Sequence, residues 1–419
     1  MSKNNLKIFL SYHKNTPVYK SDSFQPIQVG TELGDKLDFA LKDNTGDNIS
    51  FLNKYYCELT GHYWVLKNYI DTCEEEYIGF AHYRRLPDLK TLSDEDFPSI
   101  YGINYSVSQQ LFEDLVSSDL YDYCKDYDVI LPCSVYMYAN TVNPSLREDE
   151  QHYNLYDHFK TEHKNNLLDL LYEIADDELK QYLSQCFSME KAYFYNIYIM
   201  KKDLMKDFLS WQFDILEKLG QKIGGWEQEK YLRMAGFVAE TLTNVWVKMK
   251  TDKQNLHIGH VPLYMIDFES EYIEKANLYH QQGLYSEEIK ELEKLLEISS
   301  MKFDIYVSMA ENYILLNNND KAEKYFLLAK KEANSGEDSY RLAQIAMRIA
   351  KNEVYPLINE AIEREHEKLF ASHFLQYAES VHDLDLTEKA WDLLKTFELT
   401  SDEQNRYSQF LRLSSMIKS

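Results

Sequence analysis

Residues able to bind phosphate follow directly after an apolar run in the first half of the chain. Tyr77–Ala81 reads as a buried strand, and His82, Tyr83, Arg84 and Arg85 come immediately after it. Ligands of α/β sheets bind beyond the carboxyl ends of the strands. The guanidinium group of arginine offers a planar fork of donors that matches phosphate oxygens. In a chain with a formal net charge of −24, this pair predicts a phosphate site rather than surface decoration.

A turn-rich polar segment, residues 43–50, precedes this motif. Its backbone amides and its Asn and Asp side chains could hold a hydroxylated or phosphorylated ligand. In the alternative interpretation, Ser50 simply caps the helix that carries Tyr56–Thr60 and ends at Lys67-Asn68.

Several familiar catalytic signatures are missing from the sequence. There is no Walker A loop, no G-x-G-x-x-G, no H-E-x-x-H and no G-x-S-x-G. Their absence disfavours P-loop NTPases, dinucleotide-dependent oxidoreductases, zincins and serine hydrolases. The acidity, which both halves share, argues against a nucleic-acid binder and gives no polybasic patch for anionic lipid.

Cysteine content and hydropathy indicate the compartment. The five cysteines are odd in number and form no C-x-x-C pair, which favours reduced thiols over a disulfide or zinc framework. No window approaches the roughly 20 apolar residues of a membrane span, and the N-terminal apolar stretch is too short for a secretory signal. We expect a cytoplasmic protein. The alternative is a protein attached peripherally to the inner face of the membrane.

Strands and helices alternate in the first half and must position the polar residues. Short apolar runs at 6–11, 77–81, 128–131 and 193–200 predict strands, and amphipathic helical patterns lie between them. This alternation favours an α/β domain with a largely parallel sheet covered on both faces.

Residues 269–419 show helical patterns only, and similar residues recur about 34 positions apart, as Ala276 and Ala310 do. Small residues at this period resemble tetratricopeptide repeats, in which alanine lets paired helices approach closely. The unit near 344–365 is degenerate, with Pro356 where alanine is expected. We therefore expect an all-α helical-repeat domain that serves either as an interaction surface or as a stability or dimerisation module.

The first half also resembles a bacterial family of capsular and exopolysaccharide biosynthesis glycosyltransferases, long catalogued only as a domain of unknown function. The resemblance covers about residues 5–265 and does not extend to the repeats. The principal matching segments are Ser11–Lys14, Pro26–Gly30, Asp43–Ser50, Tyr56–Thr60, Tyr77–Gly79, His82–Arg85, Asn196–Lys202 and Arg233–Glu240. Thr241 departs from the family pattern, in which arginine usually follows the glutamate.

This resemblance implies a GT-A-like fold with a Rossmann-like mixed sheet, and a hexosyltransferase-like enzyme that uses a nucleotide-sugar donor, expected to be UDP-linked. Such folds usually place an Asp-x-Asp metal motif after a central strand, and His82–Arg85 takes that place here. Either Arg84 and Arg85 neutralise the leaving diphosphate directly, or His82 ligates a divalent Mn or Mg ion with a carboxylate such as Asp47. The sequence leaves metal dependence open.

The resemblance and the strand ends together give a set of expected site residues. The donor is expected to contact Ser11, His13, Gly30, Asp47, Asn48, His82, Tyr83, Arg84, Arg85 and Arg233. If the reaction inverts the sugar, a base must deprotonate the acceptor hydroxyl, and the candidates are Glu240 and Asp157. For each of these two, a solvated carboxylate is the alternative interpretation.

The sequence therefore predicts a glycosyltransferase domain over residues 1–268 and a helical-repeat domain over 269–419. The first would move a sugar to a surface polysaccharide or glycoprotein acceptor. The second would bind a protein partner, position the acceptor or mediate self-association. The rival hypothesis is a non-catalytic interaction protein, with a degenerate transferase domain and partner-binding repeats.

Overall fold

The chain folds into two compact units, Met1–Phe268 and Glu269–Ser419. The computed structural model describes residues 5–34, 37–97, 105–107, 115, 120–137 and 153–418. None of the described helices combines the length and apolar character needed to cross a bilayer.

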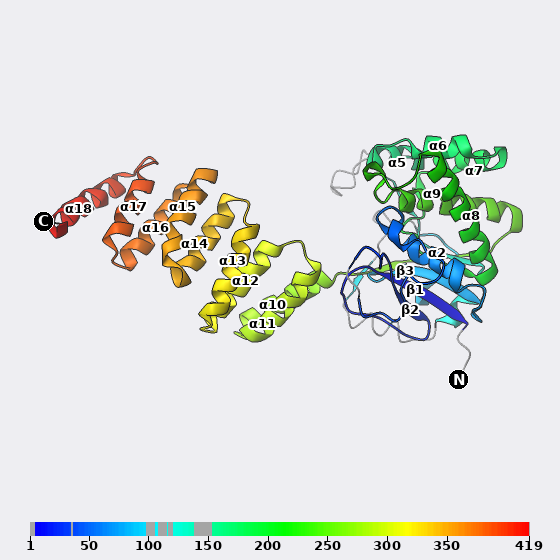
Figure 1. Cartoon of the computed structure of the whole chain (residues 1–419), viewed down its shortest axis with the longest axis horizontal. Helices are drawn as coiled ribbons and strands as arrows, with labels where there is room; N and C mark the ends of the chain where they lie inside the picture. Colours follow the sequence, from blue (N-terminus) through cyan, green and yellow to red (C-terminus); the bar gives the residue numbers. More distant parts are fainter. Residues whose placement is uncertain are drawn as a thin grey trace. The chain divides into compact units, whose positions relative to one another are not determined.

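A nine-stranded mixed sheet forms the centre of the first unit (Figure 1). Seven of its strands run in the order β10-β6-β9-β3-β4-β11-β5, and β1 pairs with both β2 and β3. Their bounds are Leu6–Tyr12 (β1), Phe24–Gln28 (β2), Tyr77–His82 (β3), Arg85–Pro87 (β4), Tyr105–Val107 (β5), Val129–Pro132 (β6), Tyr198–Lys201 (β9), Ile258–Val261 (β10) and Leu263–Ile266 (β11). The strands β7 (Val135–Tyr136) and β8 (Lys191–Ala192) form a separate pair.

The predicted α/β class is confirmed, whereas the expectation of a largely parallel sheet is wrong. β1 runs parallel to β2 and β3, but β9 runs antiparallel to both of its neighbours, β3 and β6. Tyr195 and Asn196 adopt left-handed conformations, with φ of 74° and 50°. The chain therefore turns sharply within the predicted strand 193–200, and β9 begins only at Tyr198.

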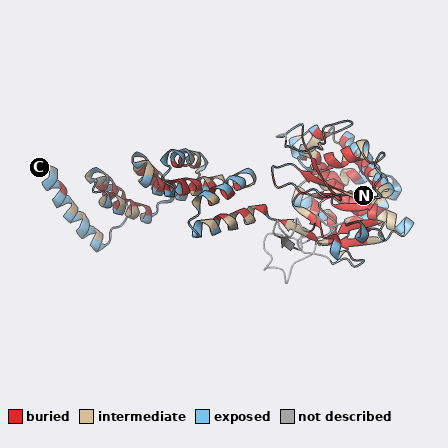
Figure 2. Ribbon diagram, turned by 90° about the horizontal axis from the view of Figure 1, so that it is seen from below, coloured by how far each residue is buried: buried red, intermediate tan, exposed pale blue. Residues whose placement is uncertain are grey.

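Helices on the sheet close the core of this unit (Figure 2). The helices of the unit are α1 (Asn53–Tyr56), α2 (Leu59–Asn68), α4 (Tyr121–Cys124), α5 (Leu155–His163), α6 (Leu167–Ile174), α7 (Asp177–Phe187), α8 (Lys202–Lys222) and α9 (Met234–Gln254). Phe9 and Phe80 of the sheet join Phe208 of α8 and Trp246 of α9 in one buried cluster. Burial of each such side chain contributes about 1.5–3 kcal/mol, so this cluster fixes the sheet against the helices.

The single helix expected around residues 56–68 is interrupted. α1 ends at Tyr56 and α2 begins at Leu59, because Cys57 adopts a non-helical conformation with a φ of 51° and a ψ of −132°. The side-chain amide of Asn53 donates to the carbonyl oxygen of Cys57 at 2.7 Å and to Oγ1 of Thr60 at 3.1 Å. These bonds hold the break, which places Glu58 at the carboxyl edge of the sheet.

A fully buried carboxylate, Asp43, organises the loop that follows β2. It accepts hydrogen bonds from the backbone amides of Gly30 and Thr31, at 2.7 and 3.1 Å. It also accepts from the hydroxyls of Ser50 and Thr60, both at 2.6 Å. The Ser50 side chain therefore bonds Asp43 and does not cap a helix. Through Thr60, the same carboxylate connects the loop to α2.

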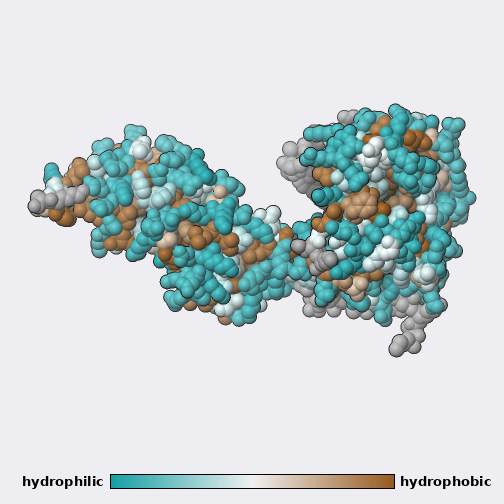
Figure 3. All heavy atoms as spheres, viewed as in Figure 1, coloured by the Kyte–Doolittle hydropathy of each residue, from teal (hydrophilic) through white to brown (hydrophobic). Residues whose placement is uncertain are grey.

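The second unit consists of paired helices (Figure 1), which confirms the all-α prediction. They are α10 (Phe268–Gln281), α11 (Tyr285–Ile298), α12 (Lys302–Leu315), α13 (Asn319–Glu332), α14 (Gly336–Ile349), α15 (Lys351–Glu365), α16 (Lys368–Ser380), α17 (Leu384–Leu394) and α18 (Ser401–Lys418). Alanines such as Ala310, Ala322 and Ala378 are fully buried, as close helix packing requires. Apolar patches interrupt the hydrophilic surface of this unit (Figure 3). Its assignment to tetratricopeptide repeats stays a prediction.

The Asp43 interaction predicts a large loss of stability in Asp43→Asn. An amide puts a donor NH2 group opposite groups that themselves donate, so we expect a loss of about 2–4 kcal/mol in the free energy of unfolding. Urea denaturation followed by tryptophan fluorescence measures this loss in the first unit. That unit holds Trp64, Trp211, Trp226 and Trp246, four of the five tryptophans in the chain.

The exposed neighbour provides the matched control, because Asp47→Asn should change stability by less than about 0.5 kcal/mol. Equal stability of Asp43→Asn and the wild type would show that this carboxylate does not hold the loop.

Candidate functional site

The His82–Arg85 motif forms a tight hairpin. His82 ends β3 and Arg85 begins β4, and the two residues pair in antiparallel fashion, so Tyr83 and Arg84 form the turn. The Tyr83 amide donates to the carbonyl oxygen of Ser11 at 3.2 Å. Ser11 and His82 are partners in the parallel pair β1–β3. The carboxyl ends of both strands therefore present polar side chains at one place.

A cavity of about 410 Å³ opens at this hairpin. Such a volume lies within the range of small-ligand sites. Seven of the residues predicted for donor binding line it, namely Ser11, His13, His82, Tyr83, Arg84, Arg85 and Arg233. The lining is completed by five residues to which the sequence analysis assigned no role in the site, namely Val29, Asn53, Lys54, Cys57 and Glu58.

The lining carries a concentration of positive charge in an acidic protein. Lys54, Arg84, Arg85 and Arg233 all reach the cavity. Among the described residues, no carboxylate lies within ion-pair distance of Lys54, Arg84 or Arg233. The guanidinium group of Arg85 lies over the Tyr195 ring, 4.6 Å from its centroid. These cations therefore have charge available for an anionic ligand.

The two histidines of the cavity are neutral at physiological pH. Burial, together with the charges of Arg85 and Arg84, lowers the pKa of His82 to about 3. Desolvation by the surrounding protein and the charges of Lys14 and Arg84 lower the pKa of His13 to about 4. Neutral imidazole rings both donate and accept hydrogen bonds, so they suit hydroxyl groups of a ligand.

Buried polar atoms of the lining are left without partners. Oγ of Ser11 and Nε2 of His82 make no hydrogen bond within the described part of the chain. Buried polar atoms of folded proteins normally find a partner, and an unsatisfied one requires an explanation. A ligand that carries hydroxyl or phosphate groups would supply the missing bonds.

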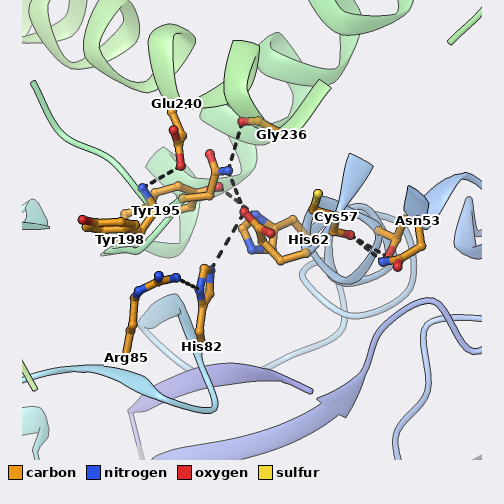
Figure 4. A network of polar contacts seen from close by, with 12 residues as sticks. Asn53, Cys57, His62, His82, Arg85, Tyr195, Tyr198, Gly236 and Glu240 are labelled. Atoms are coloured by element: carbon orange, nitrogen blue, oxygen red, sulfur yellow. Dashed lines mark hydrogen bonds and ion pairs between the residues drawn. The ribbon is translucent and has the colours of Figure 1, made fainter. Parts of the chain in front are cut away.

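Two enclosed carboxylates, Glu58 and Glu240, lie beside these cations. Oε1 of Glu58 accepts a hydrogen bond from Nδ2 of Asn196 at 2.7 Å and lies 3.9 Å from Nε2 of His82. Oε1 of Glu240 accepts from the backbone amide of Tyr195 at 2.8 Å. Figure 4 shows Glu240 reaching down from its helix toward Tyr195, while Arg85 and His82 approach from the sheet below.

The protonation of the two carboxylates is linked. Burial raises the pKa of Glu58, despite its hydrogen bond from Asn196. Burial and the charge of Glu58 raise the pKa of Glu240 to about 8. Two carboxylates in one enclosed site do not both ionise readily, so Glu240 holds a proton at neutral pH. Such a proton-holding carboxyl, next to unpaired cations, is an arrangement suited to proton transfer.

Strained backbone positions surround the cavity. Cys57, Tyr195, Asn196 and Arg233 all have positive φ values, which non-glycine residues rarely adopt. The amide of Arg233 donates to the carbonyl oxygen of Lys54 at 2.9 Å, which joins the start of α9 to α1. Residues held in such conformations cluster at functional sites in proteins generally.

Two predicted donor contacts, Asp47 and Asn48, do not reach the cavity. Asp47 is exposed, and its carboxylate accepts from the Tyr63 hydroxyl at 3.2 Å. Its backbone amide donates to Oδ1 of Asn68 at 3.0 Å. The side-chain amide of Asn48 donates to the carbonyl oxygen of Gly46 at 3.1 Å. The polar groups of segment 43–50 thus bond to the protein itself.

Gly30 and Asp157 also lie outside the cavity lining. Gly30 has a φ of 68°, and a Cβ there would lie 2.5 Å from Oδ1 of Asn53. Its glycine identity is therefore explained by packing. Asp157 is exposed in the first turn of α5, where its carboxylate accepts from the Asn154 side chain at 2.8 Å. The solvated alternative describes Asp157 better than a role as base.

The hypothesis of a metal held by His82 and Asp47 gains no support from this geometry. His82 lines the cavity and Asp47 does not. Within the described residues, no group of three or more His, Cys, Asp or Glu side chains could hold a metal ion. The residues present do not fit a metal site at this hairpin.

The chain matches the model of the family described as "Domain of unknown function (DUF4422)" over residues 7–252. No curated protein matches it. Among solved structures, the apo structure of the bifunctional glycosyltransferase WbbM is similar, with a TM-score of 0.51 and 23% sequence identity. The match covers 63% of this chain and 46% of that chain, so this chain spans under half the length of the WbbM chain. At this identity the likeness shows a glycosyltransferase-like fold. Because the family model spans more than half of its residues, the chain belongs to the DUF4422 family.

Proposed function

We propose that the first unit transfers a sugar from a nucleotide-sugar donor, expected to be UDP-linked, to a hydroxyl of a surface polysaccharide or glycoprotein. One observation carries the proposal: four basic side chains and an enclosed carboxylate, Glu58, line a single cavity at the carboxyl edge of the sheet, with a second enclosed carboxylate beside it. The likeness to a glycosyltransferase fold supports it.

The cations account for activation of the donor. Arg84, Arg85 and Arg233 would bind the diphosphate, and their charge would stabilise the negative charge that develops as the sugar–phosphate bond breaks. Arg84 and Arg233 are exposed, so only the half-buried Arg85 would interact more strongly through a local dielectric constant below that of water. The unpartnered atoms of Ser11 and His82 would hydrogen-bond hydroxyl groups of the donor.

Glu240 would act as the general base in a single displacement. In its ionised form, which is the minor form at neutral pH and predominates above about pH 8, this carboxylate would take the proton of the acceptor hydroxyl while the acceptor oxygen bonds to the anomeric carbon. The diphosphate leaves with the electrons of the broken bond, and the anomeric centre inverts. A carboxylate whose pKa is raised holds the transferred proton more firmly than an exposed one. Glu58 and Asn196 would position this assembly.

The charged residues at the cavity argue against the rival hypothesis of a non-catalytic interaction protein. Two carboxylates enclosed together are unfavourable for folding, and a domain without catalytic function has no need of them. The role of the second unit in binding a partner, positioning the acceptor or mediating self-association is part of this proposal.

The diphosphate role predicts that Arg84→Ala and Arg85→Ala each lower kcat/KM for sugar transfer by at least about 100-fold, the scale of losing one charge-stabilising contact. Transfer and donor hydrolysis are measured with a panel of nucleotide sugars, with and without manganese. Circular dichroism and urea denaturation check that both variants fold.

Arg341→Ala is the matched control, because Arg341 lies on α14 of the second unit and pairs with Asp304. Wild-type rates in both cavity variants would refute the diphosphate role. Absence of turnover by the wild type with every nucleotide sugar would refute the enzyme.

The raised pKa of Glu240 predicts a pH-dependent stability. Between its ordinary pKa of 4.5 and about 8, the folded state holds a proton that the unfolded state has released. The free energy of unfolding therefore falls as pH rises through this window. Glu240→Gln removes the effect, and we expect the variant to gain on the order of 3 kcal/mol over the wild type between pH 5 and pH 9.

Urea denaturation at pH 5 and pH 9 measures this gain. Glu217→Gln, at an exposed position, serves as the control and should change stability by the same small amount at both pH values. An equal effect of Glu240→Gln at both pH values would show that Glu240 does not hold a proton in the folded protein.

A further inference from the structure

A second, smaller hollow of about 280 Å³ lies beside Glu240, outside the cavity described above. His158 and His163 of α5 line one side of it. Glu240 and Thr241 of α9 line another, and Phe194, from the loop before β9, lies between them. The hollow thus lies where the helical layer meets the segment that carries Tyr195.

Two polar atoms of this hollow lack partners. Oγ1 of Thr241 and Nδ1 of His158 are buried and make no hydrogen bond within the described residues, and the Thr241 side chain is only 1% exposed. Threonine in a helix ordinarily bonds back to a carbonyl oxygen four residues earlier, as Thr243 does to Ala239 at 3.0 Å. The Thr241 hydroxyl makes no such bond, so its hydrogen-bonding capacity is open to a ligand.

Aromatic rings make up most of the remaining lining, which also includes Leu155 and Glu162. The rings of His163 and Phe237 stack with centroids 4.1 Å apart, and those of His158 and Phe194 lie 5.7 Å apart. Burial and the neighbouring His158 lower the pKa of His163 to about 4, so this ring carries no charge at neutral pH. Aromatic faces combined with a few polar atoms fit a sugar ring, which has an apolar C–H face and hydroxyls at its edge.

Glu240 and Phe237 connect this hollow to the cationic cavity. The Glu240 carboxylate lines the hollow, and it also interacts electrostatically with Arg85 and Arg233. The guanidinium group of Arg233, which lines the cavity, lies 5.2 Å from the centre of the Phe237 ring. A molecule in the hollow would therefore lie next to Glu240, which also interacts with the arginines of the cavity.

We propose that this hollow binds the acceptor sugar residue, with its nucleophilic hydroxyl directed at Glu240 and a second hydroxyl bonded to Thr241. The proposal rests on the proposed function and adds the place and the class of the acceptor. In the reaction, the acceptor O–H proton goes to the ionised form of the Glu240 carboxylate, and the acceptor oxygen bonds to the anomeric carbon. The bond from that carbon to the diphosphate breaks, and the diphosphate takes the electron pair.

The test compares Thr241→Val, which removes the hydroxyl at nearly constant volume, with the matched control Thr243→Val on the same helix. Methyl glycosides of common hexoses and N-acetylhexosamines are the probes. Their binding is followed by saturation-transfer NMR and, where transfer occurs, by acceptor KM. We expect Thr241→Val to weaken glycoside binding and raise the acceptor KM at least tenfold, with the effect on the donor KM much smaller. Thr243→Val should behave as the wild type.

A second variant, Phe237→Leu, should weaken the same glycosides by removing the aromatic face. The proposal is overturned if no glycoside binds the wild type, or if both hollow variants keep the wild-type affinity and acceptor KM. Failure of the proposed function looks different, because the wild type would then neither bind nor hydrolyse any nucleotide sugar. In that case glycoside binding, measured without donor, still decides whether the hollow holds a sugar.

Discussion

The site depends on one electrostatic balance, in which clustered basic side chains lie beside two enclosed carboxylates. Arg84 and Arg85 repel each other, and so do Glu58 and Glu240. Arg84 and Arg233 are exposed, so water solvates them, whereas the two enclosed carboxylates have pKa values raised by burial and, for Glu240, by the charge of Glu58. Together they leave the arginines free of ion pairs within the described residues and leave a proton on the carboxylate pair. An anionic donor would shift this balance, since it adds negative charge where the cations converge.

Hydrogen bonds in the surrounding loops and helices hold the backbone in the unfavourable conformations that place these charged side chains together. Asp43 fixes the loop after β2 and, through Thr60, the start of α2. The break at Cys57 then directs Glu58 toward the sheet edge, and the hairpin turn does the same for Arg84. The loop, the helix break and the hairpin turn each depend on nearby contacts, and all three place side chains at the ends of β1 and β3. These hydrogen bonds would give the site the rigidity that the proposed catalysis needs.

Sequence reasoning located the part of the site that follows regular elements. His82–Arg85 and Ser11 were found because they end apolar runs, and Arg233 because it belongs to a recognisable family segment. Glu58 also lies in a matching family segment, but it was given no role, because this segment has helical periodicity and the break in the helix depends on the Asn53 side chain and on a positive φ. Asp47 was wrongly expected in the cavity, because its hydrogen-bond partners, Tyr63 and Asn68, lie far along the chain and the sequence does not reveal them. The direction of β9 was likewise set by a turn that propensity does not reveal.

The most direct test is a crystal structure of the full chain with uridine diphosphate, the expected leaving nucleotide. The account predicts that both phosphates lie in the cavity at the β3–β4 hairpin, within hydrogen-bond distance of Arg84, Arg85 and Arg233. It also predicts that the neighbouring hollow beside Glu240 stays free for a sugar. Binding of the phosphates elsewhere, for example along segment 43–50, or no binding at millimolar nucleotide, would contradict the central claim.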